Sequence, residues 1–119
     1  MARLFLRIDL EPQGRIGPGK IALLEAIART GSISAAGRSL RMSYRRAWVL
    51  VDELNHLFAE PLVTTQLGGQ HGGGAALTEL GASLVARFRA LEAAVGPLAD
   101  EHLGPFATLA AKAGGGAGG

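Results

Sequence analysis

The sequence predicts a mainly α-helical fold with a small β-sheet, and three observations support this class. Two segments, residues 32–40 and 43–58, each begin with a serine and continue with apolar residues at helical spacing. Two short strand-like segments, residues 62–67 and 75–77, enclose a glycine-rich turn. A long helical segment follows Thr78. Together these elements predict a winged helix-turn-helix followed by a long C-terminal helix.

The composition limits the possible classes of protein. A chain of 119 residues is long enough for one compact domain. It has no cysteine, which excludes a disulfide framework and a thiolate metal site. The N-terminus carries charges at Arg3, Arg7 and Asp9 where a signal peptide would be apolar, and no apolar run has the length of a membrane span. We therefore expect a cytoplasmic protein that is not attached to a membrane.

The first thirty residues predict a strand and then a helix. Residues 4–10 alternate leucine or isoleucine with other residues, which is the period of a half-buried strand, and this strand is a candidate third partner for the glycine-containing hairpin. A loop with proline and glycine follows. Pro18 then occupies the first position of a helix that Gly31 ends, and its broad apolar face is expected to support the next two helices.

The two segments that begin at Ser32 and Ser43 predict a helix-turn-helix pair. Small residues at 35–37 allow the first helix to cross the second closely. The second helix has one apolar stripe, formed by Ala47, Leu50, Val51, Leu54, Leu57 and Phe58. On the opposite side lie Arg45, Val49, Asp52 and His56, with Tyr44 and Arg46 on its flanks; we expect Trp48, between the two sides, to serve packing.

The charges favour contact with an anionic partner. Four arginines and no acid lie between Arg38 and Arg46. Arginine near a helix N-terminus does not stabilise the helix, because the helix dipole favours acids there. The alternative is a solvated basic face. Together with two capped helices, the pattern favours nucleic-acid binding, with the first turn of the second helix in the major groove.

The hairpin that follows the second helix is predicted to be the wing. Its glycines let the backbone approach a sugar-phosphate chain closely, and Gln70 and His71 are its polar side chains. A phosphate-binding loop would need Gly-Lys-Ser/Thr at its end, whereas this loop closes on Gly74, Ala75 and Ala76. The three histidines are scattered, so neither a metal site, a cofactor nor an enzyme active site is expected.

The C-terminal helical segment is predicted to pair two copies of the chain. Its apolar residues alternate steps of four and three and form one seam: Leu84, Phe88, Leu91, Val95 and Leu98. The alternative is that this seam closes the core of its own domain. Gly96-Pro97 and Gly104-Pro105 are expected to break the segment into short helices. The predicted organisation is a DNA-binding domain at 1–78, a helical dimerisation segment at 79–112 and a flexible tail at 113–119.

Several of these motifs resemble a known family. Gly31-Ser32-Ile33-Ser34, then Ser43-Tyr44 with Ala47-Trp48, and the glycine wing that ends in Leu77-Thr78, are similar to the N-terminal DNA-binding domain of ModE-type molybdate-dependent transcriptional regulators. That domain is related to the winged helix of LysR-type regulators. The resemblance covers about residues 4–95. It implies that residues 43–46 face the major groove, that the wing lies along the DNA backbone, and that a dimer pairs through the N-terminal and C-terminal segments.

Family members that sense molybdate carry C-terminal oxyanion-binding domains, and nothing in this chain resembles one. Molybdate binding by this chain is therefore not expected, although molybdenum-related genes remain candidate targets. We expect a dimeric regulator that binds double-stranded DNA at an inverted repeat. Arg45 is the first candidate for a bidentate contact with guanine and Val49 for contact with a thymine methyl group. The complete set of expected DNA contacts is Ser32, Ser34, Arg38, Arg41, Ser43, Tyr44, Arg45, Arg46, Val49, Gln70 and His71. The rival hypothesis is a winged-helix module that binds protein instead of DNA.

Overall fold

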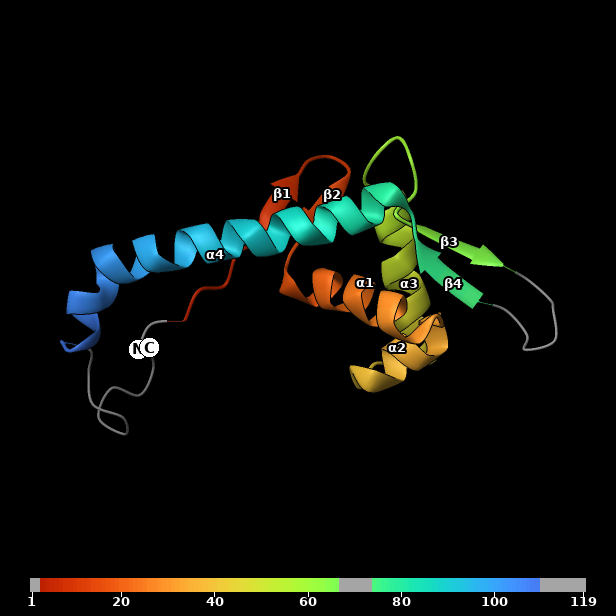
Figure 1. The fold of residues 1–119 in the computed structure, drawn as a ribbon, viewed down its shortest axis with the longest axis horizontal. Coiled ribbons are helices and arrows are strands. Elements are labelled where there is room, and N and C mark those ends of the chain that lie inside the picture. The colour runs from red at the N-terminus through yellow and green to blue at the C-terminus, as the bar shows by residue number, and fades with distance from the viewer. Residues whose placement is uncertain (1–2, 67–73, 110–119) are drawn as a thin grey trace.

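The computed structural model describes residues 3–66 and 74–109. In chain order the elements are β1 (Ile8–Leu10), β2 (Gly14–Ile16), α1 (Pro18–Thr30), α2 (Ile33–Ser39), α3 (Tyr44–Asn55), β3 (Val63–Gln66), β4 (Gly74–Leu77) and α4 (Glu79–Ala107). Figure 1 shows α1, α2 and α3 grouped under the first half of α4, with the β3–β4 hairpin projecting from one end. The predicted mainly α-helical class with a small β component is confirmed.

The helix ends lie where the capping residues predict them. Pro18 begins α1, and Gly31 ends it in the left-handed conformation, with φ at 72° and its N–H donating to the Ile27 carbonyl. The Ser32 hydroxyl accepts from the Ala35 N–H at 3.1 Å, and Ser43 does the same for Arg46 at 3.0 Å. The junctions between these helices are therefore short and fixed.

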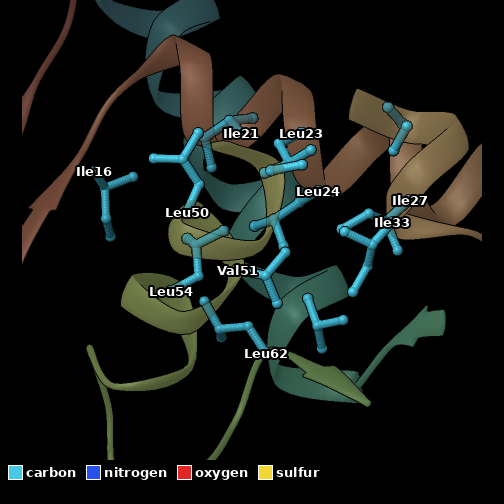
Figure 2. Packing of buried hydrophobic residues seen from close by; sticks show 14 of the residues in the cluster. Ile16, Ile21, Leu23, Leu24, Ile27, Ile33, Leu50, Val51, Leu54 and Leu62 are labelled. Carbon is cyan, nitrogen blue, oxygen red and sulfur yellow. The ribbon is translucent and has the colours of Figure 1, made fainter. Parts of the chain in front are cut away.

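The core lies between α1 and α3. Figure 2 shows side chains of α1, including Leu23 and Leu24, packed beside Leu50, Val51 and Leu54 of α3. The predicted apolar stripe of α3 is buried from Ala47 to Leu57, whereas Phe58 is 37% exposed and the prediction for it is wrong. The reason is that α3 ends at Asn55, so residue 58 no longer follows the helical phase. The fully buried large side chains are Ile21, Leu23, Leu24, Ile27, Leu54 and Leu62.

The N-terminal strand does not join the wing, which corrects the expectation that it supplies a third strand. β1 instead pairs with β2 in a separate antiparallel sheet, in which Ile8 lies opposite Ile16 and Leu10 opposite Gly14. Residues 14–16 were expected to be loop, because a three-residue strand is too short to show a period of two. Burial nevertheless alternates from Arg3 to Leu10, as the sequence predicts.

The second correction concerns α4, which is one helix from Glu79 to Ala107 and passes through both Pro97 and Pro105. A proline inside a helix removes one hydrogen bond and crowds the carbonyl four residues earlier. Here those carbonyls belong to the exposed residues Ala93 and Glu101, where water can replace the lost donor. The cost is a bend and not a break: Figure 1 shows the last turns of α4, coloured blue, turned away from the axis of the rest.

An ion pair joins α4 to α1. Arg89 donates to both carboxylate oxygens of Glu25, at 2.7 and 3.0 Å, and to Glu92 at 2.8 Å. The hydrogen bond from Arg89 holds the pKa of Glu25 below its ordinary value. Because that pKa is lowered, the stabilisation is present above the ordinary carboxyl range and is lost as the pH falls through the lowered value. Both side chains are partly solvated, so the pair orients the helix more than it stabilises the fold.

The second half of α4 extends beyond the packed helices (Figure 1). A helix of 29 residues is about 43 Å long, and the molecule measures 58 × 29 × 27 Å, so α4 determines its long dimension. Within residues 3–66 and 74–109, no helix combines the length and the apolar character that a membrane crossing needs.

Candidate nucleic-acid interface

The α2–α3 crossing is closer than most helix contacts. A Cβ atom at Gly37 would lie 2.9 Å from the Cβ of Ala47, so only glycine fits there without displacement of α3. The turn between the helices closes when the N–H of Met42 donates to the Gly37 carbonyl at 2.9 Å. Arg41 in this turn has φ at 60°, a left-handed conformation that is costly for a residue with a side chain. The turn therefore fixes the direction in which α3 leaves α2.

The basic side of α3 faces solvent, as the sequence predicts. Tyr44, Arg45 and Arg46 are exposed on the first turn, and Val49 is exposed one turn later. Among the side chains in the described residues, no carboxylate forms an ion pair with Arg45 or Arg46. The guanidinium groups are therefore available to an anionic partner.

The two acids of α3, Asp52 and Glu53, each lie beside a basic side chain. The Glu53 carboxylate lies 3.2 Å from the Lys20 ammonium, which also donates to the Arg15 carbonyl at 2.9 Å. A carboxylate oxygen of Asp52 lies 3.6 Å from Nδ1 of His56. Lys20 is thus engaged within the protein. The acids do not offset the arginines of the first turn, because they lie two turns further along α3.

The wing consists of β3, β4 and the loop between them. Its register pairs Val63 with Leu77 and Gln66 with Gly74. The Ala75 N–H donates to the Gly31 carbonyl at 2.9 Å, which attaches β4 to the α1–α2 junction. The expected contacts Gln70 and His71 lie outside the described residues, as does the tail at 113–119. The base of the wing is therefore fixed relative to α2 and α3.

Asn55 holds the wing to α3, a role that the sequence analysis missed. Its Oδ1 accepts from the N–H groups of Leu62 and Val63, each at 2.9 Å, and its Nδ2 donates to the Val63 carbonyl at 3.0 Å. The amide thus satisfies three backbone groups at the start of β3. A single asparagine at the end of a helix has no sequence signal that would distinguish this role from a helix cap.

The expected contact residues lie at four places around α3. Arg45 and Val49 share the exposed hollow on α3 with Tyr44 and Trp48. Arg38 and Arg41 are exposed at the α2–α3 turn, and Arg46 lies on the opposite flank, beside Arg15 of β2. Ser32 and Ser34 line a cleft between α2, α3 and the base of the wing. The Ser43 hydroxyl accepts the capping bond from the Arg46 N–H, which leaves its O–H and one lone pair for a partner.

Trp48 does not have the packing role that we expected from the sequence. It is 39% exposed and belongs neither to the buried cluster nor to the hydrophobic side chains packed against it. Its aromatic neighbour is Tyr44, with ring centroids 6.1 Å apart and planes inclined by 60°. The helical wheel alone could not show which neighbour would cover the indole.

The expected dimer seam divides into two parts. Phe88 is only 3% exposed within its own chain and Leu84 packs against the same core, so the alternative of core closure describes this part. Leu91 and Leu98 are exposed, the latter by 53%, and Val95 is intermediate. Only the part of the seam from Leu91 onward leaves apolar side chains exposed for contact with a second copy of the chain.

Residues 19–82, more than half of the chain, match the family described as bacterial regulatory helix-turn-helix protein, lysR family. The match extends from the start of α1, through α2, α3 and the wing, to the first turn of α4.

Three relatives are similar over most of this chain. Molybdenum-pterin-binding protein MopB of Rhodobacter capsulatus is 51% identical over 76% of the chain and 34% of its own length. Molybdenum transport protein ModE of Azotobacter vinelandii is 42% identical over 73% of the chain and 32% of its own length. DNA-binding transcriptional dual regulator ModE of Escherichia coli is 34% identical over 92% of the chain and 44% of its own length. The chain thus spans from about a third to less than half of the length of these relatives. The predicted resemblance to the ModE DNA-binding domain is confirmed.

Proposed function

Because the chain belongs to the LysR family of bacterial regulatory helix-turn-helix proteins, we propose that it binds double-stranded DNA as a dimer at an inverted repeat and thereby regulates transcription. The observation that carries this proposal is the exposed first turn of α3, where Arg45 and Arg46 have no ion-pair partner in the described residues. The opposite side of the same helix is buried, so the charged side has a fixed direction.

The residues divide into base contacts and backbone contacts. Arg45 presents a planar guanidinium suited to O6 and N7 of guanine, and Val49 an apolar group suited to a thymine methyl. Arg38 and Arg41 at the turn, with Ser32 and Ser34 beside the wing, suit phosphate oxygens, which fix the register and carry no sequence information. Gln70 and His71, in the sequence between β3 and β4, are proposed as two further phosphate contacts.

The dimer is proposed to form through the exposed part of α4. Leu91 and Leu98 continue the heptad spacing and are exposed, and Figure 1 shows α4 extending past the packed helices α1, α2 and α3. In a two-fold dimer two copies of α3 would enter successive major grooves about one helical turn apart. Residues 79–112 are then the dimerisation segment and residues 1–78 the DNA-binding domain. Sedimentation should give a dimer for the native chain and a folded monomer for Leu91→Glu with Leu98→Glu; a native monomer would contradict this part.

The names of the relatives suggest the candidate targets. Two of them are named for molybdenum and one for DNA-binding transcriptional regulation. We include genes of molybdenum transport and use among the targets.

The proposal is tested by titration of random duplex DNA at several salt concentrations, followed by selection of bound fragments from genomic DNA. Each phosphate that an arginine neutralises contributes about −0.9 to the slope of log affinity against log salt. Arg38 and Arg41 supply two such contacts on each chain, so a dimer is expected to give a slope of about −4 and to enrich an inverted repeat. A flat response without enrichment would instead favour the protein-binding module, which the exposed Tyr44, Trp48 and Val49 could equally serve.

A further inference from the structure

Two aromatic side chains lie exposed on α3, beside the arginines. Tyr44 is 65% exposed and Trp48 39%, and together they form the aromatic pair. They are four residues apart, so they lie on the same side of the helix, in its first two turns. Neither ring takes part in the buried core, whose largest side chains come from α1, α3 and the start of β3. The pair therefore leaves a substantial apolar surface in water outside the buried core.

The position of the pair is specific. Trp48 and Tyr44 line the cleft between α2, α3 and the base of the wing, where Thr65 and Gln66 form the other wall. The same two rings also line the exposed hollow that contains Arg45 and Val49. The aromatic pair thus connects the base-contacting side of α3 to the wing. Figure 1 shows the β3–β4 hairpin beside α3.

The surrounding charges indicate which class of partner covers the rings. Arg45 lines the exposed hollow together with both rings, and Arg38 and Arg41 are exposed at the end of α2 and in the turn before α3. Asp52 and Glu53 line the same hollow, one turn further along α3 than Trp48. A partner that buries the rings from the N-terminal side of α3 must also approach these three guanidinium groups, which favours a polyanion with apolar groups at its edge. Double-stranded DNA has both, because each thymine presents a C5-methyl group in the major groove.

We infer that the aromatic pair determines specificity by enclosing the C5-methyl group of a thymine on the wing side of the base that Arg45 contacts. The inference rests on the proposed DNA binding. Trp48 is the main contact, since it lies one turn further along α3 than Tyr44 and is the more enclosed of the two rings, at 39% against 65% exposed. Tyr44 packs against the indole in a tilted arrangement, which supports the position of that ring.

The chain provides its own probe, because Trp48 is its single tryptophan. The full chain is mixed with a selected operator or with random duplex of equal length, and quenching of the tryptophan emission by acrylamide is measured. We expect quenching to fall several-fold on the operator and much less on random DNA. Equal quenching of the free and the operator-bound chain would overturn the inference, while measured DNA binding would keep the proposed function intact.

A second series identifies the methyl group. Each thymine of the operator is replaced in turn by uracil, which lacks only that methyl. One replacement on the wing side should weaken binding of the native chain about fourfold, the value of one buried methyl group. Trp48→Ala should bind the operator at least tenfold more weakly and be insensitive to the same replacement, whereas Phe58→Ala, a matched aromatic beyond α3, should behave as the native chain. If no uracil changes the affinity of the native chain, the inference is wrong, whether or not Trp48→Ala folds.

Discussion

The two sides of α3 differ in their surroundings: one side is packed against other helices, and the other is exposed to solvent. On one side Ala47, Leu50, Val51 and Leu54 are buried against α1 and α2. On the other, Arg45 and Val49 are exposed, and among the described residues no carboxylate pairs with that arginine. The two sides of α3 therefore have different tasks: the buried side fixes the direction of the helix, and the exposed side is free to make contacts. Substitutions on the two sides should therefore change different measured quantities.

The largest expected effect is on the buried side. Leu54→Ala removes a side chain with no exposed surface and should lower the free energy of unfolding by about 2 to 5 kcal/mol. Val49→Ala, the matched change on the exposed side, should alter it by less than about 0.5 kcal/mol. Denaturant unfolding measures both. A similar loss of unfolding free energy in both variants would show that the two sides of α3 do not differ in their contribution to stability.

The next effect concerns the contact between α3 and the wing. Asn55→Ala removes three hydrogen bonds and leaves the N–H groups of Leu62 and Val63 without their acceptor, so the free energy of unfolding should fall by about 2 to 3 kcal/mol. Asn55→Asp keeps the acceptor oxygen and should lose less. Thermal unfolding distinguishes the two variants, and equal losses would show that the acceptor is not the important atom.

On the exposed side Arg45→Ala should leave the free energy of unfolding unchanged. Its affinity for the selected operator should fall by about 1 to 3 kcal/mol, with relaxed specificity at one base pair. Binding of random DNA should change much less. An equal loss on operator and random DNA would identify Arg45 as a phosphate contact instead of a base contact.

The smallest effect sharpens the comparison because it moves stability and affinity in opposite directions. Arg41 has φ at 60°, where glycine is under no steric strain, so Arg41→Gly should raise the free energy of unfolding by about 0.5 to 1 kcal/mol. The same change removes one candidate phosphate contact from each chain, two per dimer, and should make the salt slope of DNA binding shallower by about 1.8. Arg29→Gly, at an exposed residue inside α1, is the control: it should destabilise the chain.

Much of this architecture follows from the sequence through local rules. Ser32 and Ser43 define the starts of α2 and α3, and the spacing of the apolar residues determines which side of α3 is buried and where Arg45 points. These features depend on residues close together in the chain. The glycine-containing wing is predictable for the same reason.

The features that the sequence did not predict depend on tertiary context. The β2 strand is too short to show a period, and α4 continues through Pro97 and Pro105 because the carbonyls that lose their donors face solvent. Asn55 joins segments that only the folded chain brings together. The exposure of Trp48 depends on the space that α2 and the base of the wing leave beside α3.

The role of the exposed side of α3 is tested best by an NMR titration of the full chain, labelled with ¹⁵N, with a selected operator duplex. The largest shift changes should occur at the backbone N–H groups of Arg45 and Val49 and at the Nε–H group of Arg45. The signals of the buried residues Leu50 and Leu54 should change little. Large changes confined to α4, with the signals of Arg45 unmoved, would contradict the claim that the exposed side of α3 binds DNA.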